Sequence, residues 1–235
     1  MDIENPLLLH IETATDICSV ALTEGEKVLA VCESNDGNSH SKNLLPFIEN
    51  AMKKAGRKLE ELNGVVVSIG PGSYTGLRIG VSTAKGIAYS LQVPVIAVST
   101  LESIASGCRS QFESPSSQQI IPMIDARRME VFAARYDADM NLLDDVAAVI
   151  VEENTYDELL ATQPVVFCGN GMPKCKSLLS KYENAKFADF VLSAKFMLPT
   201  ALKKWKAKDF ADTAYFEPFY LKEYVAAKPH VKGLE

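Results

Sequence analysis

The sequence predicts an α/β protein of two lobes, each a mixed sheet flanked by helices. Three observations predict it: an antiparallel meander at the start, a buried parallel-type strand with a helical crossover, and a polar segment at 110–119 before a second half with a loosely similar element order. With 235 residues, 47% of them hydrophobic, the chain is long enough for two cores. We place an N-terminal lobe at 1–109 and a smaller, degenerate C-terminal lobe at 119–235, with the option that the last helix and tail pack back on the first lobe.

Alternating apolar runs and turn signals predict the elements of the first lobe. Two short runs on either side of the polar turn 12–16 predict a hairpin, which a third run extends into a meander. The uninterrupted run GVVVSI is typical of a strand covered on both faces, and therefore indicates a parallel sheet. The expected elements are strands at 7–11, 17–23 and 28–32, a helix at 41–55, a strand at 64–69, a helix at 77–91, a strand at 94–98 and a short helix from 99 to about 107.

The helix expected at 77–91 is apolar on two sides. Leu77, Val81 and Ala84 share one seam, while Ile79 and Ile87 lie on another. One side is expected to pack on the sheet and the other on another helix.

The second half is predicted to be a hairpin followed by strand–helix pairs. Apolar runs flank the polar turn 125–128, and Pro173 suits the first turn of a helix. The expected elements are strands at 120–124, 131–136, 146–151 and 165–168, helices at 155–161, 173–180 and 194–206, and an extended aromatic tail at 215–224.

Charge and cysteine content exclude several classes of protein. The net charge of -6 has the wrong sign for an autonomous nucleic-acid binder. Five scattered cysteines do not make a disulfide framework, which favours a reducing, cytoplasmic location. The acidic start lacks a basic leader region, and no apolar run approaches the roughly 20 residues that span a bilayer, so neither export nor membrane insertion is expected.

The loop GPGSYTG, residues 70–76, is the main candidate for binding chemistry. Glycines before a helix let backbone N–H groups approach an anion, so phosphate contact is one interpretation. However, Leu77 and Arg78 stand where a P-loop needs Lys and Ser or Thr, and Thr75 breaks the dinucleotide pattern. A nucleophile elbow also fails, because Pro71 and Thr75 occupy its glycine positions. A structural, interface-shaping loop is the favoured interpretation.

No metal site made only of protein side chains is expected. His10, His40 and His230 are dispersed, and the gap between Cys168 and Cys175 is not a zinc-ribbon spacing. His10 is expected to be a satisfied sheet histidine, whereas His40, at a helix start, would cap the helix or contact a partner.

Seven segments resemble, in order, the bacterial TsaB family, also called YeaZ. They are LLLHIETATDICSVAL, HSKNLLP, VVVSIGPGSYTGLRIGVSTAKGIA, PVIAVSTLESIA, PMIDARRMEVFAA, GNG and PFYLKEY. The resemblance covers nearly the whole chain, and GPGSYTGLRIG is its most specific part, with Tyr74 where Phe is common. It implies the actin-like, Hsp70-like ATPase fold with two lobes. It also implies work in making threonylcarbamoyladenosine beside the anticodon of tRNAs that read codons beginning with A.

The resemblance further implies a catalytically silent subunit that dimerises with the related enzyme TsaD and activates it. TsaD binds a metal through two histidines spaced four apart, and this sequence has Thr100 and Ile104 there, which removes that chemistry. The family's dimer face consists of the helices that begin near HSKNLLP and GPGSYTGLRIG. The implied interface residues are His40, Leu44, Leu45, Ile48, Tyr74, Leu77, Arg78, Ile79 and Val81. The other implied partners are TsaE, a second copy when TsaD is missing, and tRNA through the complex only.

No cofactor of its own is expected, although ATP or ADP contact at the interface through Gly70, Gly72 and Ser73 stays open. The family usually has Asp-Thr after the first strand. Here Glu12-Thr13 is one methylene longer, which weakens any claim to hold a metal-nucleotide. The rival interpretation is an enzyme acting alone, a weak ATPase or a peptidase of this fold, and the dispersed histidines and cysteines disfavour a peptidase. A tRNA-binding module is a third interpretation, which conflicts with the acidic charge balance.

Overall fold

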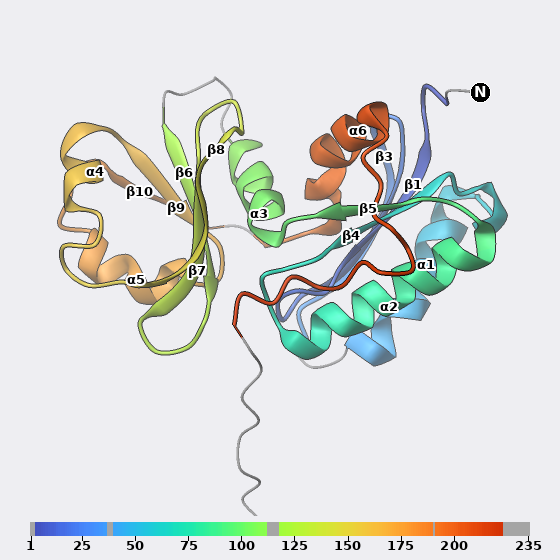
Figure 1. Ribbon diagram of the computed structural model, residues 1–235, viewed down its shortest axis with the longest axis horizontal. Helices are drawn as coiled ribbons and strands as arrows, with labels where there is room; N and C mark the ends of the chain where they lie inside the picture. The colour runs from blue at the N-terminus through green and yellow to red at the C-terminus, as the bar shows by residue number, and fades with distance from the viewer. Residues whose placement is uncertain (1–2, 37–39, 112–117, 190, 223–235) are drawn as a thin grey trace, which may run out of the picture.

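The computed structural model describes residues 3–36, 40–111, 118–189 and 191–222, which form two lobes side by side (Figure 1). Each lobe is built on a mixed sheet, as predicted, and each sheet has five strands. The strand order is β3-β2-β1-β4-β5 in the first sheet and β10-β9-β6-β7-β8 in the second. None of the helices in this part of the chain is long and apolar enough to cross a membrane.

The first sheet begins with the predicted meander of β1 (Leu7–Glu12), β2 (Cys18–Glu24) and β3 (Lys27–Ser34). β1 then pairs in parallel with β4 (Gly64–Ser68), and β4 pairs in parallel with β5 (Val95–Val98). Every residue of β1 and β4 is buried. A strand covered on both faces has no polar side, which explains the uninterrupted apolar run GVVVS.

Helices cover both faces of the first sheet. α1 (His40–Ala55) and α2 (Tyr74–Leu91) pack on one face, below the sheet in Figure 1. The short 3-10 helix Ala194–Met197 and α6 (Leu198–Ala207) pack on the other face. Alternate residues of β1 therefore enter two separate cores, as the two-residue period of a strand requires.

The second sheet is likewise covered on both faces. α3 (Thr100–Arg109) packs on the face toward the first lobe, and α4 (Asp157–Thr162) and α5 (Met172–Leu179) pack on the outer face (Figure 1). β6 pairs in parallel with β9 and antiparallel with β7, which forms the predicted hairpin. The strands are β6 (Gln119–Asp125), β7 (Glu130–Tyr136), β8 (Leu142–Ile150), β9 (Val165–Cys168) and β10 (Ala185–Ala188).

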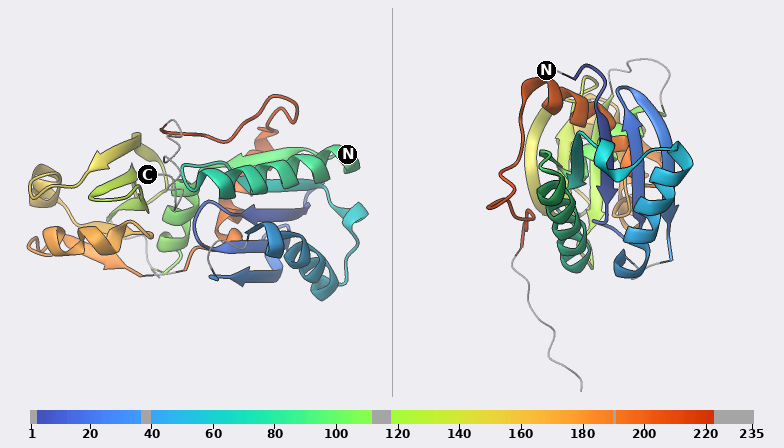
Figure 2. Two further views of the ribbon diagram at one scale, coloured as in Figure 1. Left: turned by 90° about the horizontal axis from the view of Figure 1, so that it is seen from below. Right: turned by 90° about the vertical axis from the view of Figure 1, so that its right-hand side faces the viewer.

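α3 follows the last strand of the first sheet but packs on the second sheet, and α6 follows the second sheet but packs on the first. The sequence analysis assigns residues up to 109 to the first lobe, yet the apolar side of α3 packs against buried side chains of the second sheet. α6 and the following tail lie on the first lobe, where Ala211 N donates to Val95 O at 2.9 Å and Phe219 N donates to Ile69 O at 2.7 Å. Seen from below in Figure 2, this tail runs along α2 toward the second lobe.

Some boundaries differ from those predicted. α2 begins at Tyr74, three residues early, because the Ser73 side chain caps it by accepting a hydrogen bond from Gly76 N at 3.2 Å. β8 begins at Leu142, earlier than the predicted start at 146. The sequence did not indicate this start because a largely exposed edge strand lacks the alternation that identifies strands. β10 was not predicted, since four residues give too little pattern. Residues 112–117 of the polar segment, His230 and the last two residues of the expected tail lie outside the described residues.

Candidate partner-binding surface

The outer sides of α1 and α2 form a surface that we call the α1–α2 face. In Figure 2 (left) both helices lie in front of the first sheet. Leu45 is 58% exposed and Tyr89 is 82% exposed. Large apolar and aromatic side chains that are exposed on neighbouring helices are typical of a surface that binds another protein. The exposed or half-buried residues that define the α1–α2 face are Lys42, Leu45, Glu49, Tyr74, Arg78, Ile79, Ser82, Gly86 and Tyr89.

Five residues expected at the interface belong instead to the interior of this chain. Leu44, Ile48, Leu77 and Val81 are at most 4% exposed, and His40 is 7% exposed. The sequence does not separate the inner and outer sides of these helices, because α2 is apolar on both. Leu45, Tyr74 and Arg78 do lie on the outer side, whereas Ile79 is half-buried and also packs against the first core. A charge introduced at Ile48 would therefore be buried in this chain.

The loop GPGSYTG packs closely against the turn that joins β1 to β2. Ser73 N donates to Ala14 O at 2.7 Å, and the Thr13 hydroxyl donates to Gly76 O at 2.8 Å. A Cβ atom at Gly72 would lie 2.4 Å from Ala14 O, and one at Gly76 would lie 2.1 Å from Thr13 O. Only glycine permits two backbones to approach this closely. These glycines therefore fix α2 against the first sheet.

The same contacts use backbone groups that a phosphate would need. Ser73 N and Gly76 N already have acceptors within the chain, Ala14 O and the Ser73 hydroxyl. Gly70 adopts a left-handed φ of 120°, and a Cβ there would lie 2.4 Å from Phe219 O. The geometry favours the structural interpretation of the loop over an anion cradle.

The C-terminal tail extends this surface at the start of α2. The rings of Tyr74 and Tyr220 lie 4.9 Å apart, and the Arg78 guanidinium lies 4.7 Å from the centre of the Tyr74 ring. Lys85 Nζ donates to the carbonyl oxygens of Ala214 and Phe216 at 3.2 and 3.0 Å, which holds the tail along α2. The sequence analysis kept open that the tail packs on the first lobe, but nothing in the pattern of the tail indicates that α2 is the element it meets.

Glu12 is a buried carboxyl that holds the turn after β1. One of its oxygens, Oε1, accepts hydrogen bonds from Ala14 N at 2.7 Å and from the Ser68 hydroxyl at 2.8 Å. The other, Oε2, has no partner among the described residues. Burial raises the pKa of Glu12 to about 7, because an enclosed carboxylate loses its hydration. Glu12 therefore acts here as an internal anchor.

The histidines on the first lobe are also internal. His10 Nε2 lies 2.9 Å from the Thr23 hydroxyl, and burial lowers the pKa of His10 to about 3. His40 Nε2 lies 2.9 Å from Thr15 O, so this side chain ties the start of α1 to the same turn.

The structure gives no metal-binding cluster in the part of the chain that it describes. No group of three or more His, Cys, Asp or Glu side chains there is arranged to hold an ion. Thr100 is fully buried at the start of α3, and Ile104 is 1% exposed in the apolar contact of α3 with the second sheet. These two positions serve packing.

A small cavity lies between the lobes. It measures about 260 Å³ and is lined by Thr15, Asp16 and Ile17 of the first lobe and by Gly169, Asn170 and other residues of the second. Sites for drug-sized molecules and cofactors usually occupy roughly 300–1,000 Å³, so this cavity is small for a nucleotide.

In the comparisons with known proteins, the matching family model is named for TsaD and the curated relatives are TsaB proteins. The family "TsaD: tRNA N6-adenosine threonylcarbamoyltransferase" matches residues 34–227. The tRNA threonylcarbamoyladenosine biosynthesis protein TsaB of Escherichia coli K12 is 31% identical over 228 residues, which cover 94% of this chain and 96% of that protein. TsaB of Bacillus subtilis is 32% identical over 178 residues, which cover 73% and 74%.

Solved structures show the same relationship. YeaZ from Pseudomonas aeruginosa superposes with a TM-score of 0.75 and 27% identity over 92% of this chain and all of the other. The ADPNP-bound activator of a 2-hydroxyisocaproyl-CoA dehydratase from Clostridium difficile superposes with a TM-score of 0.52 and 11% identity, over 86% and 96% of the two chains. The second likeness concerns the fold alone and agrees with the actin-like architecture. From its fold and its relatives, the chain belongs to the TsaB (YeaZ) family of tRNA threonylcarbamoyladenosine biosynthesis proteins.

Proposed function

We propose that this chain is a non-catalytic scaffold subunit that dimerises with TsaD. In this role it activates TsaD for threonylcarbamoyl transfer to the adenosine next to the anticodon in tRNAs reading codons that begin with A. The observation that supports the proposal most is the α1–α2 face, on which Leu45, Arg78 and Tyr89 are exposed. Tyrosine and arginine are among the residue types enriched at binding hot spots.

Residues of this chain support the proposal that it is not catalytic itself. Thr100 and Ile104, at the positions of the TsaD metal ligands, are buried and bear no imidazole. The hydroxyl of Ser73 caps α2, and no histidine is bonded to it in the described structure. The chain would therefore contribute position and shape, while the partner contributes the reacting groups.

The remaining partners are proposed from the family and from charge. TsaE would join the complex of this chain with TsaD, and a second copy would cover the α1–α2 face when TsaD is missing, because an exposed apolar surface seeks cover. With a net charge of -6, the chain is expected to meet tRNA through the complex only. Its place of work would be the cytoplasm.

Light scattering on mixtures with TsaD tests the proposal. The wild-type chain is expected to form a heterodimer, and Leu45→Glu is expected to weaken it at least tenfold, since the charge would be desolvated in the interface. Leu142→Glu is the matched control, because Leu142 is similarly exposed, at 49%, on the second lobe. A heterodimer that forms equally well with Leu45→Glu would contradict the assignment of this face.

A nucleotide at the interface is a separate part of the proposal. If ATP or ADP meets Gly70, Gly72 and Ser73 only when TsaD completes the site, titration calorimetry will show binding to the complex and none to either the free chain or the Leu45→Glu mixture. Binding and hydrolysis by the free chain would favour the rival function, a weak ATPase acting alone.

A further inference from the structure

Two adjacent arginines form the tip of the β6–β7 hairpin. Arg127 and Arg128 are both exposed, and both have a left-handed backbone, with φ angles of 72° and 50°. Glycine and asparagine adopt this backbone more easily than arginine does, and a tight hairpin with two such positions favours Asn-Gly. The turn alone therefore does not explain two arginines. Backbone strain of this kind is common where a side chain has a function.

Two lysines from other elements converge on the same hairpin. Lys174 of α5 pairs with Asp125 and also donates to Glu130 O at 2.6 Å. Lys222 of the tail pairs with Glu130 Oε1 at 2.5 Å. Each carboxylate of the hairpin is thus paired with a lysine, and the two arginines form no ion pair within the part of the chain that the structure describes. We call these four cations the basic patch: Arg127, Arg128, Lys174 and Lys222.

The base of the hairpin is tied to the loop GNG that follows β9. Gly171 N donates to Met123 O at 2.9 Å, and the Asn170 side chain accepts a hydrogen bond from Asp125 N at 3.1 Å. A Cβ at Gly169 would lie 2.4 Å from Met123 O, so only glycine permits this approach. The basic patch is therefore presented on a fixed support, which lowers the entropy cost of binding.

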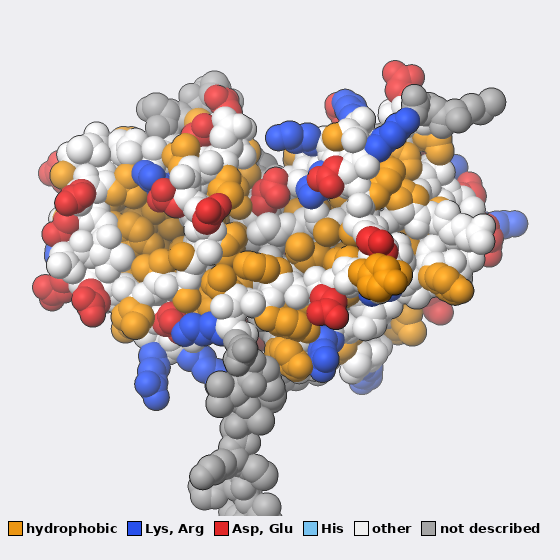
Figure 3. All heavy atoms as spheres, in the orientation of Figure 1, with side chains coloured by type: hydrophobic (Ala, Val, Ile, Leu, Met, Phe, Trp, Pro, Cys, Tyr) orange, Lys and Arg blue, Asp and Glu red, His pale blue; other side chains and the backbone are white. Residues whose placement is uncertain are grey.

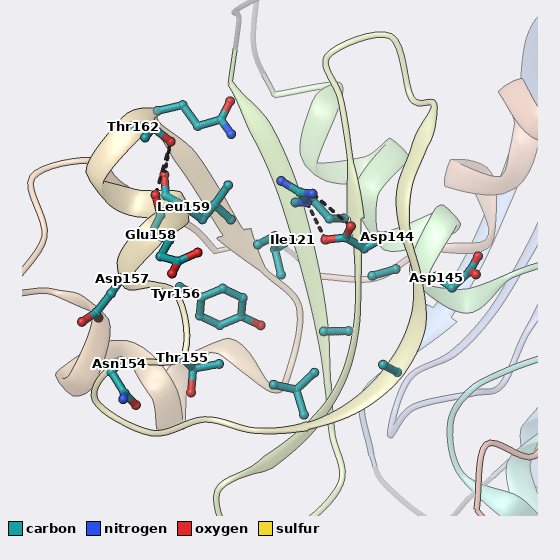
Figure 4. Close-up of a pocket in the computed structure, with 16 residues that line it drawn as sticks. Ile121, Asp144, Asp145, Asn154, Thr155, Tyr156, Asp157, Glu158, Leu159 and Thr162 are labelled. Atoms are coloured by element: carbon teal, nitrogen blue, oxygen red, sulfur yellow. Dashed lines mark hydrogen bonds and ion pairs between the residues drawn. The ribbon is translucent and has the colours of Figure 1, made fainter.

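A neighbouring part of the second lobe has the opposite charge. A groove of about 960 Å³ lies between the second sheet and α4, and Figure 4 shows Asp157 and Glu158 on its α4 side and Asp144 and Asp145 on its β8 side. Arg135 donates to Asp144 at 2.6 and 2.9 Å, and no other lysine or arginine of the described residues lines this groove. In Figure 3 acidic side chains surround the hollow, and lysine and arginine side chains gather below it, at the end of the hairpin. A polyanion is therefore repelled from the groove and attracted to the basic patch.

The basic patch lies beside one end of the α1–α2 face. The ring of Tyr220 lies 4.9 Å from the ring of Tyr74 at the start of α2, and Lys222 follows Tyr220 after one intervening residue. Two residues of chain span at most about 7 Å. A partner bound to the α1–α2 face would therefore lie next to the basic patch, so an RNA held by that partner can reach the patch as well.

We propose that the basic patch binds the phosphate backbone of tRNA when this chain is in its complex with TsaD. A guanidinium forms two parallel hydrogen bonds with a phosphate, which suits Arg127 and Arg128 for this contact. Exposed ion pairs are individually weak, so at physiological salt the patch contributes mainly where the partner already holds the RNA. A chain with a net charge of -6 can take part in RNA binding in this way. The inference rests on the proposed function for the identity of the partner.

Fluorescence anisotropy of tRNA with the complex of this chain and TsaD, over a range of salt concentrations, tests the inference. The double variant Arg127→Asn/Arg128→Gly places the preferred residues in the turn, so it should be at least as stable as the wild type in urea. It should weaken tRNA binding about fivefold or more, and it should make the dependence of log Kd on log salt shallower by about 1.5, the value for two phosphate contacts. Lys203→Gln/Lys206→Gln is the matched control, because it removes two exposed charges from α6 and should leave the affinity unchanged.

Equal affinity and equal salt dependence in the wild type and in Arg127→Asn/Arg128→Gly would overturn the inference. A variant that no longer joins TsaD in light scattering would also overturn it, because the basic patch would then bind protein. If the wild-type chain itself failed to join TsaD, the proposed function would fall, and the comparison would be made with the free chain at low salt. The basic patch still predicts weaker tRNA binding by the variant under that condition, and equal binding would overturn the inference.

Discussion

Two glycines on α2 are expected to respond to the same substitution with opposite signs. A Cβ at Gly80 would lie 2.2 Å from the Thr13 hydroxyl, whereas a Cβ at Gly86 meets nothing within 4 Å. Alanine gains about 1 kcal/mol over glycine in a helix interior. Gly86→Ala should therefore stabilise the chain by 0.5–1 kcal/mol, on the order of the propensity difference.

At Gly80 the same gain is offset by two losses. Thr13 must move away, and its hydrogen bond to Gly76 O is then lost, at about 1 kcal/mol. Overpacking against the first sheet adds about 1–3 kcal/mol. The net expectation for Gly80→Ala is a loss of about 1–3 kcal/mol.

Urea unfolding followed by circular dichroism, at one protein concentration for all variants, measures both effects. Thr13→Ala should lower the stability of the wild type by about 1 kcal/mol and recover most of the overpacking loss in the Gly80→Ala background. If Gly80→Ala proved as stable as Gly86→Ala, the view that close packing on the β1–β2 turn fixes α2 would be refuted.

Three further predictions concern the buried groups and the tail. Burial raises the pKa of Glu12 from 4.5 to about 7, so the stability that Glu12 contributes is full below pH 4.5 and lost by pH 7. Burial lowers the pKa of His10 from 6.5 to about 3, so the stability that His10 contributes is full above pH 6.5 and lost toward pH 3. As the pH falls from 6.5 to 4.5, the stability gained through Glu12 nearly cancels the stability lost through His10. In Glu12→Gln only the loss remains, so the free energy of unfolding measured in urea should fall by about 3 kcal/mol over this range. A fall no steeper than in the wild type would contradict this prediction. Ile48→Glu should abolish the folded circular dichroism signal, because a carboxylate would enter the first core; a folded variant would mean that α1 packs differently. Tyr220→Ala should leave the melting temperature within a few degrees but weaken TsaD binding several-fold in calorimetry, and unchanged binding would remove the tail from the α1–α2 face.

The sequence was sufficient for the architecture where a pattern is local and strong. The run GVVVSI, the glycine-rich turn and the long apolar helix after it predict a β-α-β crossover, and the structure contains one. The meander and the 120–136 hairpin follow from turn residues between short apolar runs. Each of these signals depends on neighbours in the sequence.

The features that the sequence did not predict depend on contacts between residues that are far apart in the chain. Which side of α2 faces inward is decided by the approach of Thr13 to Gly80, which are 67 residues apart in the sequence. The position of α3 on the second sheet and of α6 on the first depends on which lobe offers an apolar face. The outer stripe of Arg78, Ser82 and Tyr89 was the one available signal for the exposed face, because these residues recur at helical spacing.

Threonylcarbamoyl transfer to tRNA by TsaD is the measurement that tests the central claim most directly. The assay compares TsaD alone, TsaD with the wild-type chain, and TsaD with Leu45→Glu or Leu142→Glu, each in the presence of TsaE. A scaffold that acts through the α1–α2 face predicts high transfer with the wild type and Leu142→Glu, and little transfer with Leu45→Glu or with TsaD alone. Transfer by TsaD and TsaE that does not depend on this chain would contradict the account.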